Sequence, residues 1–186
     1  MRVIAGTARR LPLIAPEGKD TRPTTDRIKE TLFNIIQDDV PGAMFLDLFS
    51  GSGAIGIEAL SRGARELVAV ESSAPAAALI AQTLTALKHN RSWEHGMSAR
   101  VVKARAEKYA ACASAVAPFD VIFIDPPYAF ETEACNQLLT DLAGRELTGD
   151  DTVIMLERST RSAEPAAPEG WTISDHRDYG ETAVYY

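Results

Sequence analysis

The chain has 186 residues, which is enough for one domain with a full core and falls short of two ordinary domains. Hydrophobic residues make up 46% of it and charged residues 24%, the values of an ordinary soluble globular protein. No apolar run approaches the roughly 20 residues of a membrane span, and residues 1–6 lack the long apolar segment of a signal peptide. We therefore expect a cytoplasmic protein without a membrane partner.

The charge is unevenly distributed along the chain. A net charge of −7 by itself argues against a nucleic-acid partner. Residues 1–30, however, hold seven basic residues against four acids, a balance of +3 that leaves −10 for the remainder. A basic N-terminal arm on an acidic body is compatible with local contact to phosphates, and an ordinary solvated face is the alternative. The basic residues of this arm are Arg2, Arg9, Arg10, Lys19, Arg22, Arg27 and Lys29.

The N-terminal segments predict a small hairpin followed by a helix. Residues 2–5 and 11–14 are short apolar runs, and the polar stretch 16–25 is rich in turn formers. A helix is expected over 25–38, where apolar residues recur at helical spacing, with Thr24, Thr25 or Asp26 as N-cap. We expect residues 1–40 to form an arm packed on a core of residues 41–186, within a single domain.

Strands and helices alternate through the rest of the chain. This order predicts a parallel sheet with helices on both faces, joined by right-handed crossovers. The turn around 178–180 is too short for a crossover helix, so the last two strands should be antiparallel neighbours. The expected strands are 44–49, 66–71, 100–103, 119–124, 151–157, 171–176 and 182–186, and the expected helices after the first are 53–62, 74–88, 106–115 and 131–142.

The run from Asp47 to Gly56 joins the first of these strands to the next helix and contains Gly-x-Gly-x-x-Gly. Gly51 and Gly53 allow positive φ and let the backbone pass close to a ligand, and Gly56 lets the helix approach the sheet. This pattern is formally the dinucleotide fingerprint, so by itself it does not choose between cofactors.

Two acids near this loop distinguish the candidate cofactors. Asp47 precedes Gly51 by four residues, where a carboxylate would repel the pyrophosphate of NAD and attract the ammonium of a methionine moiety. Glu71 ends the second strand, where an acid can accept hydrogen bonds from both hydroxyls of a ribose. These residues favour S-adenosylmethionine over a dinucleotide. Backbone groups of residues 104–107, after the third strand, would hold the adenine.

A second half of the site is expected at residues 121–128. Four consecutive apolar residues, 121–124, are typical of a strand buried on both faces, and Pro126 and Pro127 end it. Asp125 and Tyr128 are therefore left at the carboxyl end of a buried strand, where open α/β sheets place their ligand chemistry.

The residue types at this strand end suit transfer to the exocyclic amine of a base. Such a nitrogen is a poor nucleophile because its lone pair is delocalised into the ring. Asp125 and the carbonyl of Pro126 would accept hydrogen bonds from both N–H groups and turn the lone pair towards a methyl donor. Tyr128 offers a face on which a base taken out of its stack can lie. Glu157-Arg158 ends the fifth strand near the same edge, and it fits a substrate contact and a local ion pair equally well.

The motifs together resemble a known family. Asp-Pro-Pro-Tyr at 125–128, with the loop at 47–53, resembles the amino-methyltransferases that act on DNA and RNA bases. The runs 22–34, RPTTDRIKETLFN, and 49–62, FSGSGAIGIEALSR, are similar to the signature of the RsmD family. That family methylates the N2 amine of a guanine in bacterial 16S ribosomal RNA, using S-adenosylmethionine. The resemblance covers essentially the whole chain.

The resemblance implies a Rossmann-like α/β fold, with a seven-stranded, mostly parallel sheet whose last strand is antiparallel. It implies 16S rRNA in an assembled or partly assembled small ribosomal subunit as the partner, and we expect a monomer. No metal is expected. The candidate catalytic residues are Asp125, Pro126, Pro127 and Tyr128, the candidate cofactor-binding residues are Thr24, Thr25, Asp47, Phe49, Gly51, Gly53, Glu71, Ser72 and Ala106, and the candidate RNA-binding residues are Arg9, Arg10, Arg22 and Arg27.

Two positions depart from the family's pattern. The family's arm usually carries a second glycine, in Gly-x-x-Arg-Gly, whereas Arg10 occupies that position here. Many relatives have Asn or Asp where Arg105 stands. Three other functions remain open: an adenine-N6 methyltransferase on DNA or RNA, a dinucleotide-dependent oxidoreductase, and a non-catalytic RNA-binding module.

Overall fold

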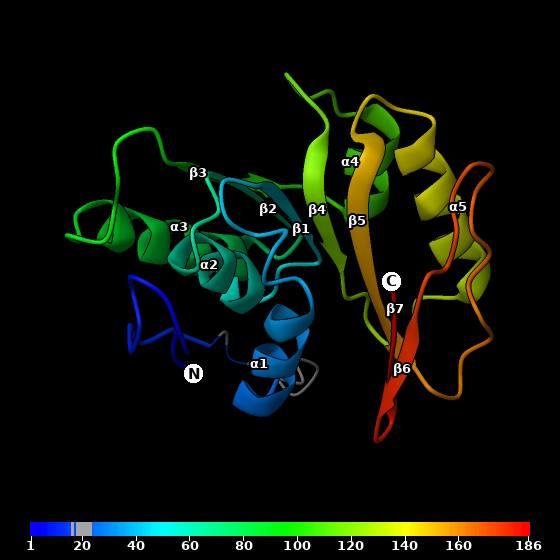
Figure 1. Cartoon of the computed structure of the whole chain (residues 1–186), viewed down its shortest axis with the longest axis horizontal. Coiled ribbons are helices and arrows are strands. Elements are labelled where there is room, and N and C mark those ends of the chain that lie inside the picture. The colour runs from blue at the N-terminus through cyan, green and yellow to red at the C-terminus, as the bar shows by residue number, and fades with distance from the viewer. Residues whose placement is uncertain (16, 18–23) are drawn as a thin grey trace.

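The computed structural model describes residues 1–15, 17 and 24–186. Its centre is a seven-stranded sheet with the strand order β3-β2-β1-β4-β5-β7-β6 (Figure 1). The first five strands pair in parallel, β7 pairs antiparallel with β5, and β6 pairs antiparallel with β7. The strands are β1 (Met44–Leu48), β2 (Glu66–Glu71), β3 (Ser98–Lys103), β4 (Phe119–Ile124), β5 (Thr148–Ser159), β6 (His176–Tyr179) and β7 (Thr182–Tyr185).

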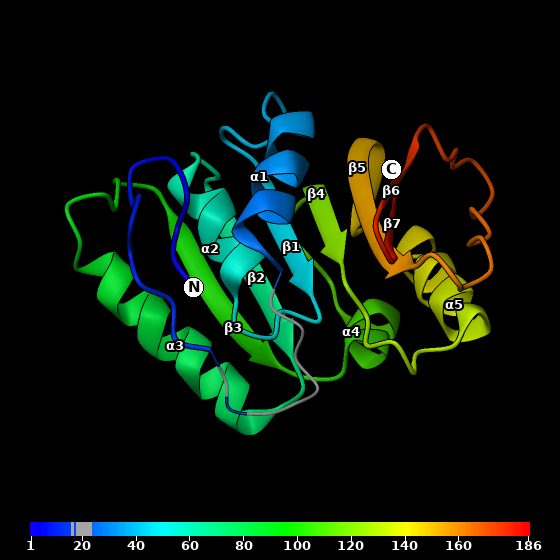
Figure 2. The same cartoon turned by 90° about the horizontal axis from the view of Figure 1, so that it is seen from below.

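Helices cover both faces of this sheet. Figure 2 shows α1, α2 and α3 on one side and α4 and α5 on the other. Alternate residues of each strand point to the two sides, so Phe123 packs with the first group of helices and Ile122 with the second. This confirms the doubly covered α/β sheet. The helices are α1 (Asp26–Ile35), α2 (Ala54–Ser61), α3 (Ala74–Lys88), α4 (Ala106–Cys112) and α5 (Thr132–Ala143).

The C-terminal hairpin is confirmed, but its first strand was expected in the wrong place. We expected a strand at 171–176, and β6 begins only at His176. Trp171 and Ile173 are apolar because they pack against the core that contains α5, while their segment forms no strand of the sheet. A tight turn at Gly180, with φ of +64°, joins β6 to β7.

The expected N-terminal hairpin is present as a short antiparallel pairing with one bridge, between Arg2 and Pro12. Val3 N–H donates to the Leu11 carbonyl at 2.9 Å and Leu13 N–H donates to the Met1 carbonyl at 3.0 Å, so Pro12, between these two bonds, needs no N–H for the pairing. The arm is also attached to α2: Thr7 N–H donates to the Ser61 carbonyl at 2.8 Å, and Ala8 N–H donates to Ser61 Oγ at 2.9 Å.

Helix α1 follows the arm and begins where the sequence indicated. Thr25 is its N-cap, and the Thr25 hydroxyl accepts the Ile28 N–H at 3.3 Å. Within the described ranges, no helix is long and apolar enough to cross a membrane.

Candidate functional site

A cavity of about 860 Å³ lies at the carboxyl ends of the central parallel strands. This is the edge of the sheet at which the sequence placed both halves of the site. Of the residues that we expected there, the cavity is lined by Thr24, Thr25, Asp47, Phe49, Gly51, Glu71, Ser72, Ala106, Asp125, Pro126, Pro127 and Tyr128.

Gly53, Arg9, Arg10 and Arg27 do not line this cavity. Gly53 caps α2 with φ of +76° and packs under the loop, so that a Cβ there would lie 3.2 Å from Ile80. Arg9, Arg10 and Arg27 are exposed on the arm and on α1. Arg22 lies outside the described residues.

Four acids form a row along this edge, one from each of four neighbouring strands. In sheet order they are Glu71 of β2, Asp47 of β1, Asp125 directly after β4, and Glu157 of β5. The parallel register pairs Asp47 with Phe123 and Ile124 with Leu156, so the alternation of side chains places all four acids on the same face of the sheet as Phe123. All four line the cavity, which is therefore strongly acidic.

Asp47 is the most deeply buried acid of the row, at 1% exposure. Its Oδ2 accepts the Gly56 N–H at 3.2 Å, which joins β1 to the first turn of α2. Burial raises the pKa of Asp47 to about 7, against the opposing effect of the Gly56 hydrogen bond. Gly56 favours this contact because a Cβ at that position would lie 2.6 Å from Leu67 Cδ1 and 3.2 Å from Asp47 Oδ2, so any other residue would push these side chains away.

Asp125 shares this environment. Its pKa is raised well above its ordinary value, first by burial and then by the carboxylates of Glu157 and Asp47. Each additional negative charge in the row raises the cost of ionising the others. A bound cation would lower that cost, whereas a pyrophosphate would add to it.

Glu71 fixes the glycine loop in place. Its two carboxylate oxygens accept the Gly51 N–H at 2.7 Å and the Ser73 N–H at 2.8 Å. Each oxygen keeps a second lone pair, so the carboxylate can still accept hydrogen bonds from a ribose.

Aromatic rings complete the site. Tyr128 is 63% exposed at the mouth of the cavity. Phe49 takes φ of +60°, which is rare for a non-glycine residue, and its ring meets that of Phe130 edge to face at 5.3 Å. A residue held in such a conformation is typical of a functional site.

The structure adds Phe130 and Arg158 to the site. Phe130 N–H donates to the Pro127 carbonyl at 2.9 Å, which closes the turn after β4. The buried Arg158 of β5 donates through Nη2 to the Phe130 carbonyl at 2.8 Å. Arg158 therefore positions the 125–130 turn. The sequence showed that Glu157-Arg158 ends a strand near the site, but not which main-chain group the arginine reaches.

The arrangement suits a positively charged ligand beside an acceptor for N–H groups. In the described part of the chain, no group of three or more His, Cys, Asp or Glu is placed to hold a metal ion. The acids are spread over four strand ends, as expected for contacts along an elongated ligand.

Comparison with known proteins finds full-length relatives. "Ribosomal RNA small subunit methyltransferase D" of Escherichia coli K12 is 31% identical over 183 residues, covering 98% of this chain and 87% of the relative. YlbH of Bacillus subtilis is 34% identical over 185 residues, covering 99% and 96%.

Solved structures agree with this result. The structure of yhhF from Escherichia coli matches with a TM-score of 0.84 and 31% identity, covering 100% of this chain and 95% of that one. Magnesium protoporphyrin IX methyltransferase from Synechocystis, solved with bound SAM, shares the fold at a TM-score of 0.62 and 14% identity, covering 86% and 76%.

The family model described as "Conserved hypothetical protein 95" matches residues 1–186. The chain therefore belongs to this family, and the resemblance to the RsmD methyltransferases is confirmed.

Proposed function

We propose that the protein transfers a methyl group from S-adenosylmethionine to the N2 amine of a guanine in 16S ribosomal RNA. One observation carries the proposal. The glycine loop after β1 and the Asp-Pro-Pro-Tyr turn after the neighbouring strand β4 line the same cavity, together with the row of acids from Glu71 to Glu157. The named activity of the Escherichia coli relative supports the choice of substrate.

The cofactor, when bound, supplies an electrophilic methyl group on a cationic sulfonium. Asp47 would attract its ammonium, Glu71 would accept hydrogen bonds from its ribose hydroxyls, and Ala106 would lie beside its adenine. Thr24 and Thr25, at the start of α1, would cover the methionine end. An acidic cavity favours this cation over the neutral product, which has lost the sulfonium charge.

Asp125 and the carbonyl of Pro126 would act on the target amine. Asp125 and the Pro126 carbonyl would each accept a hydrogen bond from one N–H of the amine. This would direct the lone pair of the nitrogen at the methyl carbon. The bound cofactor would supply its methyl carbon to this lone pair and would keep the electron pair of its C–S bond. The methylated nitrogen would then lose one proton, which Asp125 would accept and pass to water. Tyr128 would stack on the base, and Arg158 would hold the turn in position through the Phe130 carbonyl.

We also propose that the exposed arginines of the N-terminal arm bind RNA phosphates. Arg9, Arg10 and Arg27 are exposed, and the balance of charge in this segment is positive. The substrate would be rRNA in an assembled or partly assembled small subunit, and the enzyme would act as a cytoplasmic monomer. Residues 1–40 and 41–186 would work as one domain, since arm and α1 contact α2 directly.

The test is methyl transfer from labelled S-adenosylmethionine to small subunits that lack the modification, followed by mass analysis of the nucleosides. We expect label in N2-methylguanosine. Label in N6-methyladenosine would establish the adenine-N6 alternative instead, and binding of RNA without any transfer or cofactor affinity would favour a non-catalytic module.

A further inference from the structure

The fourth acid of the row, Glu157, lies beyond the residues that the proposed reaction uses. We propose that Glu157 selects guanine by accepting the hydrogen bond of the ring N1–H, next to the N2 amine held by Asp125. This inference rests on the proposed function and assigns a specificity-determining residue to the same site.

The position of Glu157 in the row identifies what it faces. Ile124 and Leu156 are register partners on β4 and β5, so Asp125 and Glu157 are the next pair along these neighbouring strands. In the proposed complex, Glu71 and Asp47 contact the cofactor and Asp125 contacts the target amine. Glu157 lies on the far side of Asp125 from Asp47 and lines the same cavity, so it faces the base.

The edges of the two purines differ in the group that this acid would meet. In guanine the neighbour of the N2 amine is N1–H, a donor, so amine and ring present donors side by side. In adenine the neighbour of the N6 amine is the unprotonated N1, an acceptor. With guanine, Asp125 can accept a hydrogen bond from the amine and Glu157 can accept one from N1–H. With adenine, Glu157 would face the lone pair of N1, and no hydrogen bond could form.

Glu157 and Asp125 lie at neighbouring strand ends, each directly after the register partners Ile124 and Leu156. The negative charge of Glu157 contributes, after burial, to the raised pKa of Asp125. The next residue, Arg158, is buried and bonded to the Phe130 carbonyl, and Arg158 is also paired in register with Ala183 of β7. The backbone on which Glu157 stands is thus fixed on both sides.

The experiment replaces the target guanine by 2-aminopurine, which keeps the N2 amine and lacks N1–H. The target is first mapped as N2-methylguanosine, and small subunits are then reconstituted with 16S rRNA carrying either base. Wild type, Glu157→Gln and the control Asp151→Asn, an exposed acid near the other end of β5, are compared by kcat/KM.

We expect wild type and Asp151→Asn to lose about 10- to 100-fold in kcat/KM on 2-aminopurine, the range for a hydrogen bond to a charged group. Glu157→Gln keeps a neutral acceptor in place of the charged one, so it should lose part of this factor on guanine and should show a clearly smaller further loss on 2-aminopurine than wild type does. Its affinity for S-adenosylhomocysteine, measured by calorimetry, should stay within about twofold of wild type.

Equal turnover of the two bases by wild type would overturn the inference without any variant. The same 2-aminopurine penalty in wild type and Glu157→Gln would also overturn it, and would leave Glu157 as a residue that only adjusts the charge of Asp125. Either result keeps the proposed function intact as long as wild type makes N2-methylguanosine. If wild type makes none, the proposed function itself fails.

Discussion

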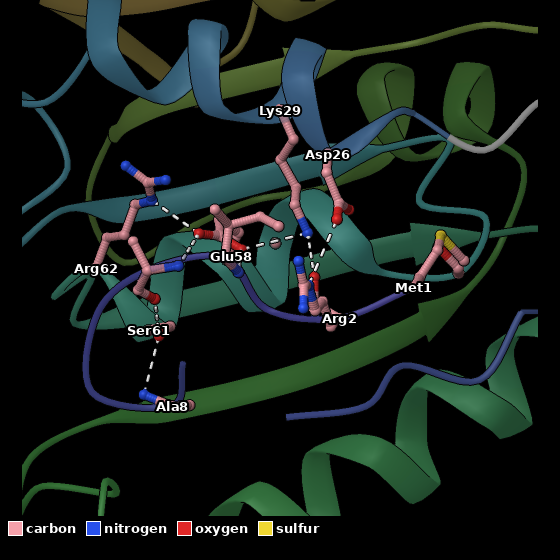
Figure 3. A network of polar contacts seen from close by, with 12 residues as sticks. Met1, Arg2, Ala8, Asp26, Lys29, Glu58, Ser61 and Arg62 are labelled. Atoms are coloured by element: carbon pink, nitrogen blue, oxygen red, sulfur yellow. Dashed lines mark hydrogen bonds and ion pairs between the residues drawn. The ribbon is translucent and has the colours of Figure 1, made fainter. Parts of the chain in front are cut away.

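Lys29 of α1 and Glu58 of α2 form a buried ion pair, with Nζ 3.3 Å from Oε2 and side-chain exposures of 2% and 0% (Figure 3). Glu58 also accepts Arg62 Nε–H at 2.8 Å, and its oxygens accept the main-chain N–H groups of Ile4 and Ala5. One carboxylate thus joins the arm, α1 and α2. Because α2 begins at the glycine loop and α1 begins at the cavity, this pair links the arm to the cofactor side of the site.

Removal of Glu58 should therefore strongly destabilise the protein. Glu58→Ala leaves Lys29 buried without its carboxylate, a loss of about 3–5 kcal/mol in the free energy of unfolding. Urea unfolding measures this, with Arg161→Ala, in an exposed ion pair with Glu181, as the control that should change little. Similar midpoints for both variants would show that the buried network contributes no more than a surface pair.

Substitution of Asp125 should separate binding from chemistry. Asp125→Ala removes an acceptor for the target amine, so kcat should fall about 10²- to 10³-fold while affinity for S-adenosylhomocysteine is retained. Asp125→Asn keeps one acceptor oxygen, so its kcat should lie between those of wild type and Asp125→Ala. Unchanged turnover of Asp125→Ala would contradict the assigned role.

The pKa of Asp47 predicts that cofactor binding releases protons. The free carboxyl titrates near pH 7, and a cation bound beside it lowers that pKa. Affinity for S-adenosylmethionine should therefore rise with pH up to about 7 and then level off. Calorimetry near pH 6.5 in buffers of different ionisation enthalpy should report proton release in wild type and a smaller release in Asp47→Asn.

The same shift makes the protein without cofactor less stable at higher pH. The pKa of Asp47 is about 7 in the folded protein, above its ordinary value of 3.8. Below pH 4 the carboxyl is protonated in both the folded and the unfolded state, so its ionisation does not affect stability. As the pH rises from 4 to about 7, the unfolded state ionises first and the free energy of unfolding falls. Asp47→Asn should remove this slope, so the unfolding free energy of the variant relative to wild type should increase between about pH 4 and pH 7 and then stay constant. Parallel stability curves for the two proteins would contradict the assignment.

Two glycines with similar backbone angles give a matched test of the arm's attachment. Gly6 and Gly42 have φ of +84° and +75°, but a Cβ on Gly6 would lie 1.8 Å from the Ser61 carbonyl oxygen, whereas one on Gly42 meets nothing within 4 Å. Gly42→Ala should cost only the backbone strain, about 1–2 kcal/mol. Gly6→Ala should cost more and should increase proteolysis of the arm. Equal losses would show that the contact with Ser61 is unimportant.

Charge reversal at Arg9 and Arg10 tests RNA binding by the arm. The double change to Glu should weaken binding of small subunits and flatten the dependence of log affinity on log salt, by about 0.7–0.9 per lost phosphate contact. Affinity for S-adenosylhomocysteine serves as the control and should not change. An unaltered salt slope would leave these residues as an ordinary solvated surface.

Arg10 has a backbone angle that favours glycine. Its φ is +74°, in the left-handed region that glycine adopts most readily. An arginine held there costs about 1–2 kcal/mol. The sequence alone showed that an arginine stands at this position, and only the structure shows that its backbone is strained.

Much of the fold could be predicted because its signals are local. The apolar run before Asp125 and the glycines after Asp47 gave a buried strand and a strand-to-helix loop, and the order of elements gave the parallel sheet. The displaced strand β6 could not be predicted this way, since Trp171 and Ile173 are apolar for packing against the core rather than for pairing. Periodicity reports burial, and it does not distinguish which neighbour buries a side chain.

The sequence alone identified the residues that we propose to carry the chemistry: the glycine loop, the acids at the strand ends and the Asp-Pro-Pro-Tyr turn. Only the tertiary structure decided how they act together, since strand order and register depend on contacts between distant segments. That order aligned Glu71, Asp47, Asp125 and Glu157 on one face, buried Asp47 enough to raise its pKa, and placed Glu58 beneath the arm. Side-chain identity is local information, whereas burial and charge coupling arise only when the strands are brought together.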